Sequence, residues 1–397
     1  MRVTRTLRAT VGAALTGALL ITASGTASAD QTRKDLWPLE AFGAQQLWQQ
    51  ATGKGITVAV LDSGFRKTHQ DLTGQFTGGA NFANTAAGDG SDDLAPHEDI
   101  RDHGTAMASI IAGHGHGSQG SDGVKGLAPD AKIMPIPQYK NGAAATRYAV
   151  DHGADVINMS YTESTPSADT CPAIHYAVEK GVVVVAGVGN DGLPKKKFPA
   201  ACPGAIGVGS VDEYGEADDD NNSTSAVDLL APGVKIPVAM GKSDSDYRTA
   251  DGSSAATAYV SAAAALLKQK YPDLTPGQIA NRLVKTAGLP QAEKDKHLKL
   301  PDAHYGHGYI QPGPALRRTI AAGPAEGPLP MPEGKAPQKA VRPGDDKGYD
   351  PDPPMGGKQA VMLYGGIGVG VLLVIGVIIG IVAATRRRNS PSHQTWS

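Results

Sequence analysis

The sequence predicts an α/β domain with a mostly parallel sheet flanked by helices, and a C-terminal transmembrane helix. Short β-branched runs alternate with small-residue stretches of helical character through the central part of the chain. The chain has 50 glycines and 28 prolines, whereas aromatic residues make up only 5%. This composition indicates many tight turns and close packing of small residues rather than a protein of long helices.

The alternation gives the order of the elements. The predicted strands and helices follow one another as Ile56 to Leu61, Ala106 to Ala112, Val156 to Met159, Ile174 to Glu179 and Val182 to Val185. Strands that alternate with helices in this way favour a parallel sheet covered by helices. Further along, Thr275 precedes a proline and lies three residues before Gln278, a capping pattern that predicts a helix to about Thr286.

The first 29 residues have the three parts of a secretory signal peptide. Basic residues near the start precede an apolar run from Val11 to Ile21, and small residues follow as far as Ala29. The apolar run is shorter than the roughly 20 residues that cross a bilayer, which disfavours the alternative of a membrane anchor. We therefore expect cleavage after Ala29, and a short N-terminal extension over 30–47.

The C-terminal region is predicted to cross a membrane once. No charged residue lies between Val361 and Ala384, and three arginines, 386–388, follow directly. About two dozen residues at roughly 1.5 Å each cover the hydrocarbon core of a bilayer. The arginines predict a cytoplasmic tail over 386–397, with the chain before the helix on the outer side.

These segments predict the domain organisation and the location of the protein. We expect the main domain over 48–318, a Pro/Gly-rich linker over 319–359 that forms an extended tether, and the transmembrane helix over 360–385. The expected location is the cell membrane, with a single span and an extracytoplasmic main domain. A formal net charge of −2 gives no reason to expect a nucleic-acid partner.

Neither the cysteines nor the other polar clusters indicate a metal or a cofactor. In an oxidising compartment, Cys171 and Cys202 are candidates for one disulfide, although two free buried thiols are the alternative. His114 and His116 flank a glycine but have no Cys or acidic partner at ligand spacing. Asp218 to Asn222 offers oxygen ligands for calcium, but a solvated acidic loop is the simpler interpretation. We therefore predict no metal and no cofactor.

Two residues in the first half of the chain have the chemistry of a catalytic pair. Asp62 follows a predicted strand, where parallel sheets deliver functional groups, although a turn with an Asx hydrogen bond is the better explanation of Asp62 taken alone. His103 stands where a loop enters a small-residue helix that holds an imidazole rigidly. A surface or helix-capping histidine is the plainer interpretation of His103 alone.

Two further residues have the chemistry of a nucleophile and of a donor to an oxyanion. Ser254 lies at a predicted helix N-terminus, where backbone N–H groups favour negative charge, although a plain N-cap serine is the alternative. Asn190 follows an apolar strand, and its amide is able to donate to a developing oxyanion. A turn asparagine is the structural alternative for Asn190.

Together these four segments resemble the subtilase family of serine proteases, in which Asp, His and Ser occur in this chain order. The resemblance extends over roughly 48–316 and includes Gly126-Leu127-Ala128-Pro129 and Asp228 to Gly233. It implies a subtilisin-like three-layer fold and a serine endopeptidase that cleaves peptide bonds through an acyl-enzyme. The implied roles are nucleophile for Ser254, general base for His103, orienting carboxylate for Asp62 and oxyanion donor for Asn190.

The resemblance also implies where a peptide or protein substrate binds. The family uses extended segments that pair with the peptide, and here they match Ser160-Tyr161-Thr162 and a segment that contains Gly187 and Val188. Subtilases usually have Gly-Thr-Ser-Met-Ala-Thr-Pro around the nucleophile, whereas this chain has alanines at 255 and 258. These changes remove volume beside Ser254, so we expect slower turnover.

The whole arrangement of signal, short extension, protease domain, tether and membrane helix resembles the mycosins, which are proteases associated with type VII secretion. The two cysteines resemble one disulfide of that group. The resemblance implies a membrane-anchored extracytoplasmic endopeptidase, with a type VII secretion membrane complex as its partner. The alternative is a weakly active or inactive scaffold that stabilises such a complex.

Overall fold

The structure is a computed structural model that describes residues 31–83, 102–138 and 141–334. The predicted signal peptide, the transmembrane helix and the cytoplasmic tail lie outside these residues. So does the part of the predicted linker beyond 334. Among the helices that the described residues form, none is long and apolar enough to cross a membrane.

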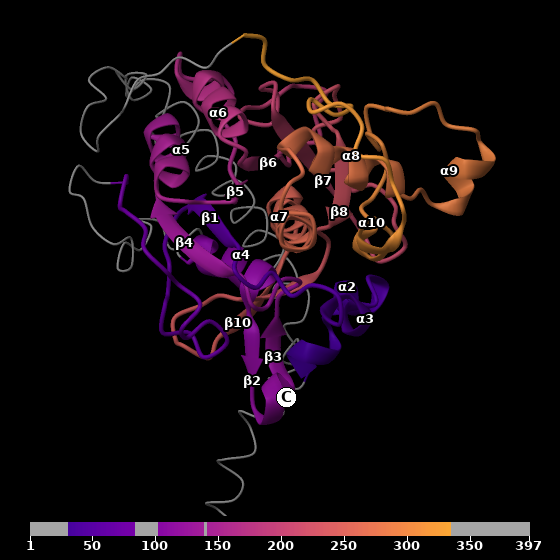
Figure 1. Cartoon of the computed structure of the whole chain (residues 1–397). Helices are drawn as coiled ribbons and strands as arrows, with labels where there is room; N and C mark the ends of the chain where they lie inside the picture. Colours follow the sequence, from indigo (N-terminus) through magenta and orange to yellow (C-terminus); the bar gives the residue numbers. More distant parts are fainter. Residues whose placement is uncertain (1–30, 84–101, 139–140, 335–397) are drawn as a thin grey trace, which may run out of the picture. The chain divides into compact units, whose positions relative to one another are not determined.

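A six-stranded parallel sheet forms the centre of the domain, in the order β4-β1-β5-β6-β7-β8 (Figure 1). The strands are β1 (Thr57–Asp62), β4 (Lys132–Pro137), β5 (Val156–Met159), β6 (Val183–Gly187), β7 (Ala205–Val211) and β8 (Leu229–Pro232). Nearly all their residues are buried, as expected for a parallel sheet covered on both faces. The predicted mostly parallel α/β fold is therefore confirmed.

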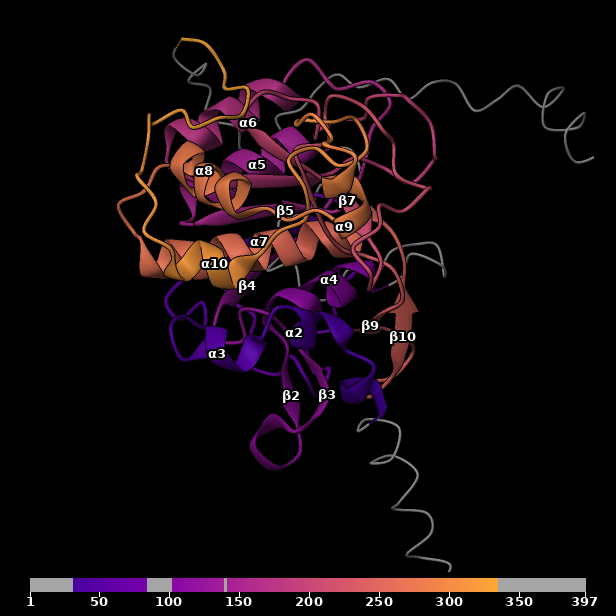
Figure 2. The same ribbon diagram turned by 90° about the vertical axis from the view of Figure 1, so that its right-hand side faces the viewer.

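Alternate residues of β1 face two different helical layers. Val58 and Val60 belong to one hydrophobic core, with α4 (His103–Ala112) and α7 (Ser253–Lys270). Ala59 and Leu61 belong to a second core, with α5 (Gly142–Asp151) and α6 (Thr170–Glu179). Figure 2 shows the sheet between these two layers of helices. The period of two along a strand thus produces the three layers.

The helix predicted from its capping pattern forms as expected. It is α8 (Pro276–Thr286), and the backbone N–H of Gln278 donates to the Thr275 hydroxyl at 3.2 Å. The Gln278 side chain accepts in return from the Thr275 N–H at 3.1 Å. Other predicted boundaries shift by a few residues, most of all at α4 and α6, which begin three and four residues before the predicted starts.

Shorter elements complete the domain. Two further antiparallel strand pairs are formed by β2 with β3 and by β9 with β10, and the residues of β9 are buried in the main core. The remaining elements are α2 (Trp37–Ala41), α3 (Ala44–Trp48), β2 (His114–His116), the 3-10 helix η1 (Ser118–Gly120), β3 (Asp122–Lys125), β9 (Ile236–Ala239), β10 (Tyr247–Ala250), α9 (Gln291–Asp295) and α10 (Pro312–Arg317).

Residues 31–47, predicted as an extension before the domain, pack into its core. Leu47 is fully buried, and Leu36 is buried as well. The Arg33 guanidinium donates to the carbonyls of Gly120, Asp122 and Gly123 at 2.9 to 3.0 Å. The extension is therefore a structural part of the domain rather than an appendage to it.

The predicted linker differs in its first part, because residues 319–334 form a strap that lies against the domain. Proline-rich segments lack N–H donors, but their carbonyls remain acceptors. Side chains of α8 use those carbonyls: Gln278 donates to Gly323, Asn281 to Ala321 and Ala322, and Arg282 to Ile320. Leu329 of the strap is buried in the main core. The expected extended tether is therefore wrong for residues 321–334.

The two cysteines form a disulfide. Cys171 lies in the first turn of α6, and Cys202 lies in the turn before β7. Their Cα atoms are 5.2 Å apart, and the bond links residues separated by 31 positions. The alternative of two free thiols is wrong.

Candidate active site

The site forms where the sheet order reverses. The chain leaves β1 for β4 on one side and then places β5 on the other side of β1. In open α/β sheets, functional groups gather at the carboxyl ends of the strands beside such a reversal. Asp62 is the last residue of β1, and His103 is the first residue of the helix that follows it in the described chain.

Asp62 and His103 form a close pair. The distance between His103 Nδ1 and Asp62 Oδ1 is 2.7 Å, and the backbone N–H of Ser63 donates to the same oxygen at 2.7 Å. Because the Asp62 carboxylate accepts a hydrogen bond from Nδ1–H, the ring proton stays on Nδ1 and Nε2 is the basic nitrogen. Asp62 Oδ2 is buried and has no hydrogen-bond partner among the described residues. The carboxylate therefore has one dominant side-chain partner, the imidazole.

The segment after Asp62 holds the start of α4. The N–H of Gly104 donates to the Ser63 carbonyl at 2.7 Å, and that of Thr105 donates to Gly64 at 3.2 Å. These bonds satisfy N–H groups that a helix start otherwise leaves open. A Cβ at position 104 would lie 2.7 Å from the Phe65 ring, so only glycine fits next to His103. The close approach of the Phe65 ring and of the Gly64 carbonyl thus explains the glycine at position 104.

Two opposing effects set the pKa of His103. Burial of the ring lowers the pKa, but the charge of Asp62 and its hydrogen bond raise it. The net result is a pKa above the ordinary histidine value. An imidazole held in this way is a stronger base, and its cation is stabilised by the neighbouring carboxylate.

Ser254 is the second residue of α7, at the same edge of the sheet. Its hydroxyl donates to the Ser160 carbonyl at 3.2 Å, and the Ser160 hydroxyl donates to the Ser254 carbonyl at 3.0 Å. Asn158, fully buried on β5, supports this arrangement by donating to the Ser160 hydroxyl at 3.0 Å. Within the described residues, no hydrogen bond joins the Ser254 hydroxyl to the His103 ring. The hydroxyl must therefore turn before His103 is able to take its proton.

Asn190 lies beside the start of α7. Its Oδ1 accepts a hydrogen bond from the Ser253 N–H at 2.8 Å, and a Cβ at Gly252 would lie 2.5 Å from its Nδ2. The Asn190 side chain is exposed, and its Nδ2 donates no hydrogen bond to any described residue. The structure thus brings a free amide donor to the residue that precedes Ser254, which fits an oxyanion donor.

The two predicted substrate segments differ in exposure. Thr162 is exposed and Tyr161 is partly buried, whereas Gly187 and Val188 are buried beneath the start of α7. The Val188 N–H already donates to the Val208 carbonyl at 3.0 Å. A peptide that pairs with this second segment would therefore donate hydrogen bonds to the carbonyl groups of the segment.

Tyr161 replaces the more usual leucine and has its own packing partner. A Cβ at Gly142 would lie 2.5 Å from the Tyr161 hydroxyl, so the ring uses space that a larger residue at 142 would fill. Burial raises the pKa of Tyr161, which keeps the hydroxyl neutral at ordinary pH. The tyrosine is thus fixed by an uncharged contact with α5.

The other polar clusters make structural contacts. His116 Nδ1 lies 2.6 Å from Asp71 Oδ1, and His114 Nε2 lies 3.0 Å from the Thr73 carbonyl. In the acidic loop, Asn221 is buried and its side-chain oxygen accepts from the Ser210 N–H at 2.8 Å. The described residues contain no group of three or more His, Cys, Asp or Glu that could hold a metal ion.

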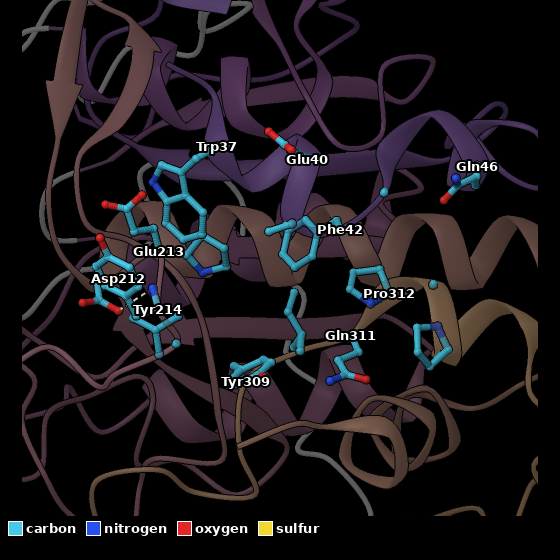
Figure 3. Close-up of a pocket in the computed structure, with 18 of the residues that line it drawn as sticks. Trp37, Glu40, Phe42, Gln46, Asp212, Glu213, Tyr214, Tyr309, Gln311 and Pro312 are labelled. Atoms are coloured by element: carbon cyan, nitrogen blue, oxygen red, sulfur yellow. Dashed lines mark hydrogen bonds between the residues drawn. The ribbon is translucent and has the colours of Figure 1, made fainter. Parts of the chain in front are cut away.

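Figure 3 shows a pocket that was not predicted from the sequence. It has a volume of about 480 Å³ and lies between α2 and α3 of the extension and the segment 309–317. Trp37, Phe42, Tyr214 and Tyr309 are among its lining residues, and none of the predicted catalytic residues is. Scattered aromatic residues carry no sequence signal for such a pocket, because they meet only in the folded chain.

Comparisons with known proteins show which family the chain belongs to. The model of the subtilase family (Peptidase_S8) matches residues 53–308. Fervidolysin of Fervidobacterium pennivorans is 33% identical over 293 residues, which cover 65% of this chain and 41% of fervidolysin. Subtilisin E of Bacillus subtilis (strain 168) is 33% identical over 251 residues, which cover 60% of this chain and 62% of that protein. The chain thus spans less than two thirds of the length of either relative.

Among solved structures, MycP1 from Mycobacterium smegmatis is similar, with a TM-score of 0.60 and 29% identity. The similarity covers 75% of this chain and 88% of MycP1. Another structure of MycP1 describes that protein as a serine protease and an essential component of the type VII (ESX-1) secretion system. The family match contains Asp62, His103 and Ser254 together with the elements that position them, so we conclude that this chain belongs to the subtilase family of serine endopeptidases.

Proposed function

We propose that the chain cleaves peptide bonds of exported proteins at the outer face of a cell membrane, through an acyl-enzyme on Ser254. The observation that carries this proposal is the 2.7 Å contact between His103 and Asp62 at the sheet edge where Ser254 and Asn190 also lie. Acyl transfer needs a nucleophile, a base, an orienting carboxylate and donors for an oxyanion. Each of these roles has a side chain or backbone group at this edge.

The reaction would proceed in two halves. In the first, Ser254 Oγ turns from the Ser160 carbonyl and attacks the peptide carbonyl while His103 Nε2 takes its proton. Asn190 Nδ2 and the Ser254 N–H bind the resulting oxyanion, and His103 then gives its proton to the departing amine. In the second half, a water loses a proton to His103 Nε2 and attacks the ester carbonyl. The bond to Ser254 Oγ then breaks, His103 gives the proton to Oγ, and the acid is released.

Replacement of the nucleophile tests this activity. We expect Ser254→Ala in the full chain to abolish cleavage of a fluorogenic peptide library and to prevent labelling by a fluorophosphonate probe. The matched control is Ser253→Ala, which removes the neighbouring hydroxyl but keeps the nucleophile, and it should still take the label on Ser254. If the wild-type chain neither cleaves the library nor takes the label, the chain is not an active serine hydrolase.

We also propose that the chain is anchored by the helix over 360–385, with the catalytic domain on the extracytoplasmic side. The uncharged stretch from Val361 to Ala384 and the arginines after it support this topology. After carbonate extraction, the full chain should stay with the membrane, whereas a chain that ends at residue 359 should be released. The N-terminus of the mature protein should be Asp30. A full chain that carbonate releases would overturn the anchor.

The likeness to MycP1 supports a place for this chain beside a type VII secretion membrane complex. A second candidate function is that of a scaffold that stabilises such a complex, and it is favoured by the resting Ser254 hydroxyl, which bonds Ser160 rather than His103. Complementation of a deletion strain separates the two. Rescue of secretion by Ser254→Ala would assign the scaffold role, whereas rescue by wild type alone would assign proteolysis.

A further inference from the structure

The residue directly before His103 has an unusual backbone conformation. Asp102 is the N-cap of α4, and its φ of 63° lies in the left-handed region. Residues other than glycine are uncommon there, although aspartate and asparagine tolerate it best. Its side chain makes no capping hydrogen bond to the helix. Helix capping therefore does not explain an aspartate at this position.

The Asp102 carboxylate is buried beside one cation. The residue is 1% exposed, and its Oδ2 lies 3.2 Å from Arg66 Nη2. Asp102 Oδ1 and Arg66 Nε are both buried and have no partner among the described residues. One acceptor and one donor of the ion pair therefore form no hydrogen bond. A bidentate arrangement, with Arg66 Nε donating to Asp102 Oδ1, would satisfy both. Since a buried charge is costly unless it is paired, the contact with Arg66 is the main compensation for Asp102.

Arg66 belongs to the segment that follows Asp62, whereas Asp102 directly precedes His103. It lies four residues after Asp62, and its backbone N–H donates to the Thr105 hydroxyl at 2.7 Å. Its guanidinium also lies 3.5 Å from Asp244 and 3.4 Å from the Gly241 carbonyl. The ion pair therefore joins the segment that follows Asp62 to the residue that precedes His103. The backbone hydrogen bonds of Gly104 and Thr105 join the same two segments, so several contacts hold Asp62 and His103 relative to each other.

We propose that Arg66 and Asp102 are positioning residues, whose ion pair holds His103 at the distance and angle at which Asp62 orients it. This inference rests on the proposed peptidase function, because its effect on rate needs an active site. The ion pair touches neither the substrate nor the reacting atoms. It acts by fixing the first residue of α4, and small misplacements of a base are costly in rate.

Kinetics of three variants test the proposal. We expect Asp102→Asn, Arg66→Met and the double variant each to lower kcat by on the order of ten- to a hundredfold, with KM within about twofold of wild type. The double variant should be no slower than the slower single variant, because either change breaks the same contact. Arg66→Lys should recover part of kcat. Asp102→Gly fits the left-handed backbone without strain, so it should fold but should remain as slow as Asp102→Asn.

A buried arginine elsewhere provides the matched control. Arg147 on α5 is 3% exposed and lies over the Tyr176 ring. Arg147→Met should lower the melting temperature but leave kcat within about twofold of wild type. If Arg66→Met and Asp102→Asn behave like Arg147→Met, with lower stability and normal kcat, the ion pair is only structural and the proposal is wrong. Full activity of Asp102→Gly, or a double variant with multiplied single effects, would overturn it as well.

A spectroscopic readout separates this proposal from the proposed function. The proton on His103 Nδ1, shared with Asp62, should give a downfield NMR resonance in the full chain that carries Ser254→Ala. We expect Arg66→Met or Asp102→Asn in that background to broaden or shift the resonance, and Arg147→Met to leave it unchanged. An unchanged resonance in the first two variants would contradict the positioning role, whatever the activity of the wild type.

Discussion

The two halves of the site are held by different kinds of contact. On the His103 side, a carboxylate at 2.7 Å, an ion pair and two backbone hydrogen bonds fix the imidazole. On the Ser254 side, the contacts are uncharged, and the hydroxyl points to a backbone carbonyl. The difference indicates that the base is ready before substrate arrives, whereas the nucleophile completes its geometry only when it turns toward His103.

The largest expected effect on kcat comes from a change on the His103 side of the site. We expect Asp62→Asn to lower kcat by about 10⁴-fold, because an amide at this position favours the wrong tautomer and does not stabilise the imidazolium, as in other serine proteases with this triad. KM should change little, since the carboxylate does not touch the substrate. Steady-state kinetics on a fluorogenic peptide measures this, and a loss below tenfold would mean that the pair is not part of the machinery.

The expected effect on the nucleophile side is smaller. Asn190→Ala should lower kcat by roughly 10²- to 10³-fold, because it removes one of two donors to the oxyanion. The rate of acylation should fall while the affinity for a ground-state substrate analogue stays near that of wild type. An equal loss of affinity would assign Asn190 to ordinary substrate binding instead.

The uncharged network beneath Ser254 should matter less again. Asn158→Ala removes an amide that bonds Ser160 and Ser261 at 3.0 Å each, so we expect a loss of about 2 to 3 kcal/mol in stability and about tenfold in kcat. The control is Asn281→Ala on α8, which removes the amide that donates to strap carbonyls. This variant should lose stability without losing kcat. Equal kcat in the two variants would show that the network does not support the nucleophile.

The fold and the identity of the four candidate residues were predictable from sequence, but the contacts that make the two halves of the site differ were not. The strand that ends at Asp62, the small-residue helix after His103 and the order Asp, His, Ser predicted the fold and the four polar residues. The Arg66–Asp102 ion pair was not predictable, because its partners are 36 positions apart and no periodic pattern links them. The Ser160 contact with Ser254 was missed for the same reason.

The ends of the domain show where composition misleads. A segment rich in proline and glycine predicts a solvated tether, yet residues 319–334 pack on the domain. Their carbonyls accept hydrogen bonds from α8, and a single leucine at 329 reaches the core. Composition gives only the average tendency of a segment to bury side chains. Whether the segment packs on the domain depends on a few carbonyl acceptors and on one apolar side chain.

The smallest expected effect on catalysis comes from the disulfide. Replacing both Cys171 and Cys202 by serine should lower the free energy of unfolding by about 3 to 4 kcal/mol, the chain-entropy value for a loop of this length. The kcat should stay within about twofold of wild type, because both cysteines pack in the second hydrophobic core, whereas α4 and α7, which carry His103 and Ser254, pack in the first. Denaturant melts and steady-state kinetics on the same samples measure this. A parallel loss of kcat would show that the α6 region and the site are coupled.

The pH dependence of Ser254 labelling by a fluorophosphonate tests the central claim most directly. The base must be neutral, and Asp62 holds the pKa of His103 above its ordinary value of about 6.5, so the labelling rate should rise with pH with a midpoint above that value. In Asp62→Asn only burial remains, so the slower reaction should have its midpoint at lower pH. A labelling rate that does not vary with pH, or an unchanged midpoint in the variant, would contradict activation of Ser254 by this histidine.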